Sequence, residues 1–141
     1  MVVTFCGHRE VYQQEQIADE LDRIIEKLIM NGADQFLLGG YEQFDMLAAR
    51  VVAKAKVRHP NIESVLVIPY LDRQYDTSLY DRTLYPALEN VPRRFAILKR
   101  NEYMVDAADI VVAYVKYEWG GAAKALEYAR RRKKQIMWMG R

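Results

Sequence analysis

Short apolar runs alternate with stretches of helical periodicity along the whole chain. Continuous apolar runs rich in β-branched residues predict buried strands, whereas apolar residues three and four positions apart predict amphipathic helices. The predicted strands are residues 2–6, 36–38, 65–68, 95–98, 110–115 and 135–139. The predicted helices are residues 17–29, 46–55, 100–108 and 121–132, and residues 70–95 form a long tyrosine-rich connection with short helical pieces.

This order of elements predicts the fold class. Strands alternate with helices, and the central strands are apolar on both faces, which indicates a parallel sheet covered on both sides. We therefore predict an α/β fold: a single Rossmann-like three-layer domain over residues 1–141, with a mainly parallel sheet of about five to six strands. Ligands of such sheets bind at the carboxyl ends of the strands, where the strand order reverses. Function is thus expected in the loops after the strands at 2–6, 36–38, 95–98 and 110–115.

The composition is that of a globular chain, with 51% hydrophobic and 28% charged residues. The formal net charge of +2 does not favour a protein whose whole surface binds nucleic acid. The apolar runs are well below the ~18 residues needed to span a bilayer, and the amino-terminal residues do not resemble a signal peptide. We therefore expect no membrane partner and a cytoplasmic location.

Cysteine and histidine are too few for an obvious metal site. The single cysteine, Cys6, excludes an intramolecular disulfide and a Cys-rich zinc site, and it favours a reducing compartment. His8 and His59 have no obvious carboxylates at metal-ligand spacing. We predict no metal and no cofactor, and we expect Cys6 to pack as a small apolar residue.

The loop after the first predicted strand, Gly7-His8-Arg9, is the first candidate site. A glycine at this position lets the chain turn tightly and lets a ligand approach the backbone. Arginine can bind a phosphate through two parallel hydrogen bonds, and histidine can donate one. The helix that follows would add free N–H groups to an anion site. The alternative is a tight turn with two exposed polar side chains.

A second candidate follows the next strand, where Gly39-Gly40 precedes Asp45. Two glycines again permit a ligand to approach the backbone closely. Asp45 is either an acceptor for a ribose or a base, or the N-terminal cap of the next helix, which is a common position for aspartate. Both roles remain open.

A third candidate is Gly120-Gly121, which opens a predicted helix after the most apolar strand. Backbone amides at such a start can hold a phosphate. Glu127 would reach a ligand only if its face of the helix lines the crevice; otherwise it is an exposed helical glutamate. Arg100, at the start of the short predicted helix, could pair with a phosphate or a carboxylate, although exposed arginines are common.

Two further features bear on nucleic acid. The basic run at residues 130–134 lies at a predicted helix C-terminus, where positive charge favourably meets the helix dipole; contact with nucleic acid is the alternative. The tyrosines of residues 70–95 could stack on a base, cover the site or bury a dimer face. No Gly-x-x-x-x-Gly-Lys-Ser/Thr run occurs, which argues against an ordinary phosphate-loop ATPase.

Several of these motifs occur in an order that resembles a known superfamily. They are Thr4 to Arg9, Gly39-Gly40 with Asp45, Arg100-Asn101 with residues 104–106 and Asp109, and Gly120-Gly121 with Tyr128-Ala129. Together they resemble the SLOG superfamily of Rossmann-like proteins, which includes DprA and the LOG phosphoribohydrolases. The resemblance covers essentially the whole chain and is strongest to the small YpsA/YoqJ-like branch. It implies a pocket for a nucleotide or nucleotide derivative at the carboxyl edge of the sheet.

The resemblance to the LOG enzymes is partial. Their motif Gly-Gly-x-Gly-Thr-x-x-Glu corresponds to residues 120–127, where both leading glycines and Glu127 match, but the third glycine is an alanine and the threonine is Lys124. Arg100 keeps the LOG spacing to Asp109. The resemblance thus implies the arginine–glutamate pair of a glycosidic hydrolase beside a changed phosphate cradle, in which Lys124 would be the phosphate cation.

Three functions remain open, in order of preference. The first is binding of a nucleotide-type small molecule, either an ADP-ribose- or NAD-like compound or a nucleoside monophosphate. Its candidate ligand-binding residues are Gly7, His8, Arg9, Gly39, Gly40, Asp45, Gly120, Gly121 and Lys124. The second is hydrolysis of the N-glycosidic bond of a nucleoside monophosphate by Arg100 and Glu127. The third is DprA-like binding of single-stranded nucleic acid. The LOG relatives also suggest a homodimer.

Overall fold

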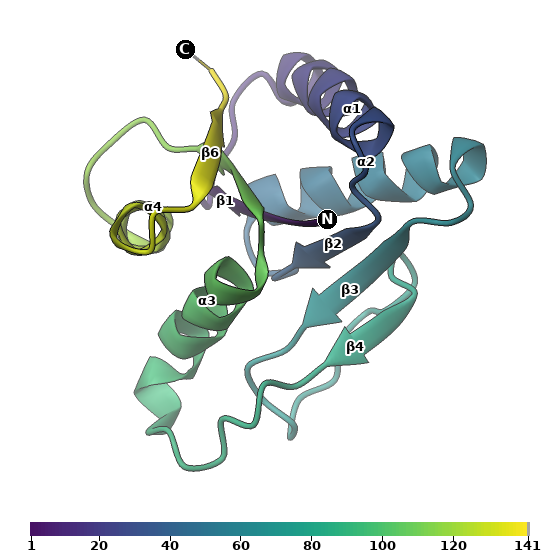
Figure 1. The fold of residues 1–141 in the computed structure, drawn as a ribbon. Coiled ribbons are helices and arrows are strands. Elements are labelled where there is room, and N and C mark those ends of the chain that lie inside the picture. Colours follow the sequence, from purple (N-terminus) through teal and green to yellow (C-terminus); the bar gives the residue numbers. More distant parts are fainter. Residues whose placement is uncertain (141) are drawn as a thin grey trace.

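A parallel β-sheet forms the middle layer of the fold (Figure 1). The computed structural model describes residues 1–140, and within them six strands pair in the order β4-β3-β2-β1-β5-β6, all parallel. The strands are β1 (Val2–Gly7), β2 (Gln35–Leu38), β3 (Glu63–Val67), β4 (Arg82–Leu84), β5 (Ile110–Tyr114) and β6 (Gln135–Trp138). The predicted Rossmann-like α/β fold with a mainly parallel sheet is confirmed.

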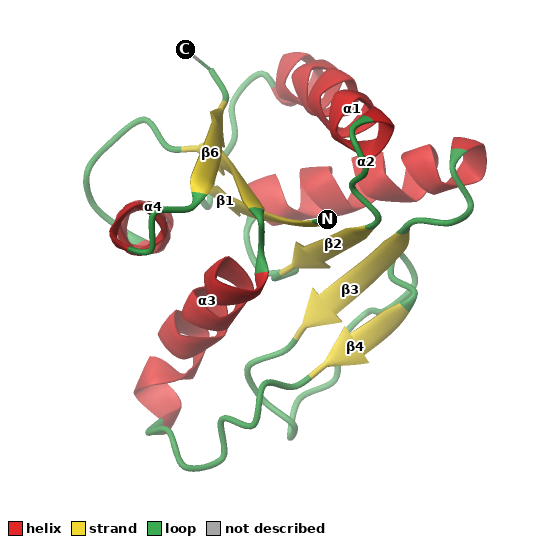
Figure 2. Cartoon of the chain, in the orientation of Figure 1, coloured by secondary structure: helices red, strands yellow, loops and turns green. Residues whose placement is uncertain are grey.

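Helices cover both faces of this sheet (Figure 2). They are α1 (Gln14–Met30), α2 (Gln43–Arg58), α3 (Ala96–Ala107) and α4 (Gly121–Arg131). α1 and α2 pack together on one face, and α3 and α4 pack together on the other. The chain runs outward from β1 to β4 and then returns to β5 on the other side of β1. The strand order therefore reverses between β1 and β5, which is where a ligand site is expected.

Helix α1 follows directly from its apolar spacing. Its buried residues, Ile17, Leu21, Ile25 and Leu28, recur every three or four positions and form one face, as an amphipathic helix requires. The opposite face carries charged side chains. No helix within residues 1–140 is long and apolar enough to cross a membrane.

Strand β5 shows why the central strands are apolar throughout. Val112 and Tyr114 belong to the apolar layer under α1 and α2, whereas Val111 and Ala113 belong to the layer under α4. Successive side chains of a strand point to opposite faces, so a strand covered on both sides has no polar face. The continuous apolar run was therefore a reliable sign of a central strand.

Residues 95–98 are not a strand, contrary to the prediction. They end a short 3₁₀ helix (Arg93–Phe95) and begin α3. An apolar run of four residues does not distinguish a strand from a buried helical turn by its periodicity. The helical period of α3 shows in its buried residues Ala96, Arg100 and Met104. The predicted strand and the helix predicted after it are therefore one helical segment.

The sixth strand lies instead inside the tyrosine-rich connection. β4 pairs with β3 at the edge of the sheet, and its first two residues are exposed, so its sequence carries little apolar signal. The rest of residues 70–95 consists of turns and irregular chain rather than short helical pieces, apart from the 3₁₀ helix. The Tyr80 hydroxyl lies 3.2 Å from the point that a Gly40 side chain would occupy. This part of the connection therefore packs over the carboxyl end of β2.

Gly7 ends β1 where Phe44 of α2 packs against it, and a Cβ on Gly7 would overlap the Phe44 ring. We expect Gly7→Ala to lower the free energy of unfolding by about 1–3 kcal/mol, the usual cost of overpacking a core. Urea titration followed by circular dichroism measures this change. Gly121→Ala is the matched control, since no atom lies within 4 Å of its Cβ position, and its unfolding free energy should not fall. An equal loss in the two variants would contradict this account.

Candidate functional site

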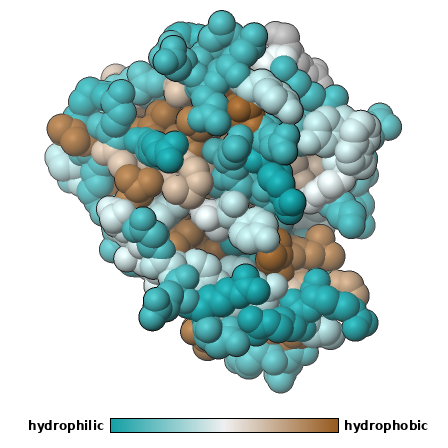
Figure 3. Space-filling view, turned by 180° about the vertical axis from the view of Figure 1, so that it is seen from behind, coloured by the Kyte–Doolittle hydropathy of each residue, from teal (hydrophilic) through white to brown (hydrophobic). Residues whose placement is uncertain are grey.

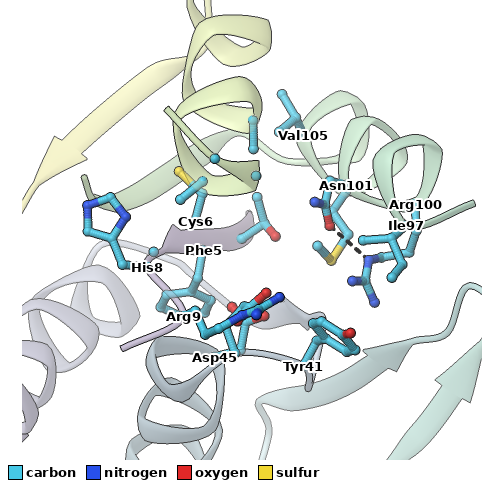
Figure 4. Close-up of a pocket in the computed structure, with 18 of the residues that line it drawn as sticks. Phe5, Cys6, His8, Arg9, Tyr41, Asp45, Ile97, Arg100, Asn101 and Val105 are labelled. Atoms are coloured by element: carbon cyan, nitrogen blue, oxygen red, sulfur yellow. Dashed lines mark hydrogen bonds and ion pairs between the residues drawn. The ribbon is translucent and has the colours of Figure 1, made fainter. Parts of the chain in front are cut away.

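A pocket of about 240 Å³ opens at the carboxyl edge of the sheet, where the strand order reverses (Figure 4). The loops after β1, β2 and β5 form its walls together with α3 and the start of α4. The lining residues are Thr4, Phe5, Cys6, Gly7, His8, Arg9, Tyr41, Glu42, Asp45, Ile97, Arg100, Asn101, Met104, Val105, Tyr117, Trp119, Gly120, Gly121, Ala122 and Ala125. The pocket thus lies where open parallel sheets hold their ligands.

His8 connects the loop after β1 to the loop after β5. Its Nε2 atom accepts a hydrogen bond from the backbone N–H of Lys116 at 2.7 Å, and its ring stacks on Tyr117 with the ring centroids 3.7 Å apart. Burial and the nearby Lys116 ammonium hold the pKa of His8 below its usual value. His8 is therefore neutral at pH 7, and it is buried, unlike the exposed side chain of the alternative interpretation.

Arg9 and an aromatic pair stand at the mouth of the pocket. The Arg9 side chain is 76% exposed and pairs with Glu42 at 3.3 Å, so its guanidinium is open to an incoming anion. Trp119 is 70% exposed and stacks on Tyr117 with ring centroids 4.3 Å apart. The mouth therefore combines an exposed cation with an exposed aromatic surface.

Arg100 lies in the floor of the pocket and is 2% exposed. Its Nη1 donates hydrogen bonds to the carbonyl oxygens of Gly39, which follows β2, at 3.0 Å and of Val67, the last residue of β3, at 2.9 Å. Its Nε donates to the Asn101 side-chain oxygen at 2.9 Å. Nε and Nη1 are thus bonded to the protein, and Arg100 is buried rather than the exposed arginine considered from the sequence.

Asp45 faces Arg100 across Gly39. A Cβ on Gly39 would lie 3.0 Å from Oδ2 of Asp45 and 3.3 Å from Nη2 of Arg100, so both side chains reach the same point. The carboxyl is 8% exposed, and its burial raises its pKa to about 6 although the Arg100 charge opposes this. Asp45 lies in the first turn of α2, whose N-cap is Glu42. Of the two roles left open for Asp45, the N-cap is therefore excluded, because that position belongs to Glu42.

The start of α4 forms the wall opposite Asp45. Gly120 has a φ of +91°, a conformation that favours glycine, and Gly121 begins the helix. The helix has no side-chain hydrogen bond at its N-cap. Glu127 and Lys124 are exposed residues further along α4 that do not line the pocket, and Glu127 lies 3.9 Å from Arg130. The predicted pairing of Arg100 with Glu127 in one site is not present.

Cys6 lines the pocket but is not a reactive thiol. Burial and the nearby Asp45 carboxylate raise the pKa of Cys6 to about 12, so the thiolate is scarcely populated at neutral pH. Within residues 1–140, no cluster of three or more histidine, cysteine, aspartate or glutamate residues could hold a metal ion.

The structure brings together most of the residues that the sequence indicated. Gly7, His8, Arg9, Asp45, Arg100, Gly120 and Gly121 line the pocket, whereas Gly39, Gly40, Lys124 and Glu127 do not. Sequence reasoning missed the lining residues Tyr41, Asn101, Tyr117 and Trp119. Each lies within three residues of a predicted candidate, so the loops were correct and the aromatic and amide members were overlooked.

The basic run at residues 130–134 lies away from the pocket and is used for packing. The Lys134 ammonium donates hydrogen bonds to the carbonyl oxygens of Asp106 at 3.0 Å and Ala108 at 2.9 Å, at the end of α3. Arg132 pairs with Asp106 at 2.9 Å. These contacts support the interpretation that the run stabilises helix ends.

Two relatives place the chain in a family. No family model matches it. A UPF0398 protein of Halalkalibacterium halodurans is 30% identical over 132 residues, which cover 84% of this chain and 70% of that protein. The prophage-derived protein YoqJ of Bacillus subtilis is 26% identical over 139 residues, which cover 82% of this chain and 81% of YoqJ. The chain belongs to the UPF0398 family.

Solved structures show that this UPF0398 protein shares its fold with SLOG-type proteins. DNA processing protein A of Helicobacter pylori has a TM-score of 0.71 at 20% identity, covering 100% of this chain and 66% of that one. The same protein from Streptococcus pneumoniae has a TM-score of 0.71 at 17% identity, and the match covers 96% of this chain and 49% of the S. pneumoniae chain. The molybdenum cofactor carrier protein of Chlamydomonas reinhardtii has a TM-score of 0.66 at 16% identity, and the match covers 97% of this chain and 74% of the carrier protein. The SLOG resemblance is confirmed at the level of fold.

Removing Arg100 should destabilise the UPF0398 protein strongly. Arg100→Met would leave the carbonyl groups of Gly39 and Val67 and the Asp45 carboxylate buried without their partner. We expect the free energy of unfolding to fall by about 3–5 kcal/mol, measured by urea denaturation. Arg94→Met, at an exposed arginine, is the control and should change it by less than about 0.5 kcal/mol. A small effect of Arg100→Met would show that the guanidinium is dispensable.

The raised pKa of Asp45 gives stability a defined pH dependence. Because the native carboxyl binds its proton more tightly than the unfolded one, its contribution is largest at low pH and declines as pH rises from about 4 to about 6. The charges and ionisable groups that face it are Arg100, Glu42, Cys6 and Tyr80.

Comparison with Asp45→Asn isolates this group. The unfolding free energy of the wild type minus that of Asp45→Asn should be higher at pH 4 than at pH 7 by about 2.4 kcal/mol. Denaturation at a series of pH values measures the difference. A difference that rises with pH would mean that the native pKa of Asp45 is lowered instead.

Proposed function

We propose that this protein binds a nucleotide or a nucleotide-derived small molecule in the pocket at the strand-order reversal. The observation that carries the proposal is the pairing of an open helix N-terminus with a polar, aromatic-edged floor in one pocket. The helix N-terminus suits a phosphate, and the polar, aromatic-edged floor suits a base. A ligand that has both groups matches the two ends of the pocket.

The phosphate end is the start of α4. The first N–H groups of a helix have no partner within it, and the helix dipole favours a negative charge there. Gly120 and Gly121 place no side chain between these groups and the pocket, and no side chain caps the helix. Arg9, exposed at the mouth, supplies the positive charge.

The base end lies between α3 and the loop after β2. Figure 4 shows Asp45, Tyr41 and Asn101 around the same open space, with Ile97 and Arg100 beside Asn101. The Tyr41 ring is 52% exposed, so it can stack on a planar ligand. Asp45 and Asn101 supply an acceptor and a donor for the edge of that ligand.

The solved neighbours favour binding over catalysis. The H. pylori neighbour binds single-stranded DNA, and the C. reinhardtii neighbour is a carrier of molybdenum cofactor. Glycosidic hydrolysis through Glu127 receives no support, because Glu127 lies outside the pocket lining.

A homodimer and a cytoplasmic location remain predictions. On the face seen in Figure 3, hydrophobic groups form small separate areas among hydrophilic ones.

Nucleotide binding is tested by thermal shift and isothermal titration calorimetry with a panel of nucleosides, nucleoside monophosphates and dinucleotides. A ligand at a hundred times its dissociation constant should raise the free energy of unfolding by about 2.7 kcal/mol. Gly121→Asp should fold normally, since an acidic residue suits a helix start, but it should weaken nucleoside monophosphate binding about tenfold or more. Its affinity for the nucleoside without phosphate should change little.

Gly121→Asn is the matched control, because it adds a side chain of the same shape without the charge. It should retain most of the affinity for the monophosphate. If no member of the panel shifts the wild type at millimolar concentration, the proposed function is wrong. If Gly121→Asn loses as much affinity as Gly121→Asp, the helix start is not a charge-sensitive phosphate site.

A further inference from the structure

The floor of the pocket presents an amide whose orientation is set by the protein. The Asn101 side-chain oxygen accepts the hydrogen bond of Arg100 Nε at 2.9 Å, which Figure 4 marks with a dashed line. Because Nε can only donate, the oxygen must face Arg100 and the Nδ2 group must point away from it. Within residues 1–140, Nδ2 has no hydrogen-bond partner in the protein. Asn101 therefore turns its donor toward the pocket, whereas its oxygen faces Arg100.

Asp45 offers the complementary groups. A carboxylate has about four acceptor positions, and the backbone N–H groups of Tyr41 and Glu42 favour the ionised form of Asp45. Acceptor positions of this carboxylate remain open to a ligand. Thr4, also in the lining, donates its hydroxyl hydrogen to the Leu37 carbonyl at 3.0 Å, so its oxygen can only accept.

We infer that the pocket selects a ligand whose ring edge carries a 2-amino-4-oxo pyrimidine, the edge of guanine. The ring N–H and the amino group would donate in parallel to Asp45, and the oxo group would accept from Asn101. This inference rests on the proposed function and specifies its ligand class.

The other nucleobases match this floor less well. Adenine would place the lone pair of N1 against the Asp45 carboxylate, and cytosine would place N3 there. Uracil has one ring N–H between two carbonyl groups, of which one would face the carboxylate. Hypoxanthine differs from guanine only by lacking the amino group, so it isolates the contribution of the second hydrogen bond. A buried acceptor left without its donor is costly, which makes such a site selective.

Two sources supply this ring edge: guanine nucleotides and pterins. Both carry the same donor–donor–acceptor order, and they differ in the group attached to the far side of the ring. The phosphate site at α4 favours the nucleotide. The experiment therefore includes a pterin without phosphate as a separate arm.

The experiment is calorimetric titration of the full chain with guanosine, inosine and adenosine 5′-monophosphates and with 6-hydroxymethylpterin. We expect the guanosine compound to bind about tenfold more tightly than the inosine compound, the loss expected for one charge-assisted hydrogen bond. The adenosine compound should bind more weakly still.

Variants assign the preference to individual residues. Asp45→Asn should reduce guanosine monophosphate affinity about tenfold and bring its ratio to inosine monophosphate close to one. Asn101→Asp keeps the bond to Arg100 but replaces the free donor with an acceptor, so it should lower guanosine monophosphate affinity even if Asp45→Asn folds poorly. Asp19→Asn, on the exposed face of α1, is the matched control and should bind as the wild type does.

The outcomes separate this inference from the proposed function. Equal or tighter binding of adenosine or inosine monophosphate would overturn the guanine preference and leave nucleotide binding intact. If no nucleotide binds, the proposed function fails and this inference fails with it. The pterin could instead bind more tightly than guanosine monophosphate and lose the same affinity in Asp45→Asn. That outcome would support selection of the 2-amino-4-oxo pyrimidine edge and identify a pterin as the ligand that carries it.

Discussion

The buried guanidinium of Arg100 is the interaction on which the carboxyl edge of the sheet depends. Burying a cation costs several kcal/mol, and three hydrogen bonds together with the Asp45 carboxylate offset that cost. The acceptors come from the ends of β2 and β3 and from α3, so one side chain sets how far α3 stands from the sheet. The width of the pocket and the orientation of Asn101 follow from the same contact.

The glycines at the strand ends are explained by this packing more than by a ligand. Gly39 leaves room for Asp45 and Arg100, and Gly7 leaves room for Phe44. A glycine after a strand does signal a close approach to the backbone, but here the approaching groups are the protein's own side chains. Gly121 is different, because its Cβ position is open.

The sequence predicted the layers and the place of the site because continuous apolar runs identify strands buried on both faces. It misassigned residues 95–98 because four apolar residues fit a strand and a helical turn equally well. It missed β4 because that strand is short, polar and at the edge of the sheet. The sequence made Arg100 a candidate but did not show that it is buried, because its burial depends on acceptors 33 and 61 residues away in the chain, which no local pattern encodes.

The two ends of the pocket depend on opposite protonation states. At the mouth, His8 accepts the N–H of Lys116, which a protonated ring could not do, and Tyr117 stacks on that ring. At the floor, Asp45 can accept two donors only when it is ionised. The pKa of His8 is lowered, and that of Asp45, at about 6, still lies below neutrality. Near pH 7 both groups therefore hold the form that the pocket needs, and acidification acts against both of these forms.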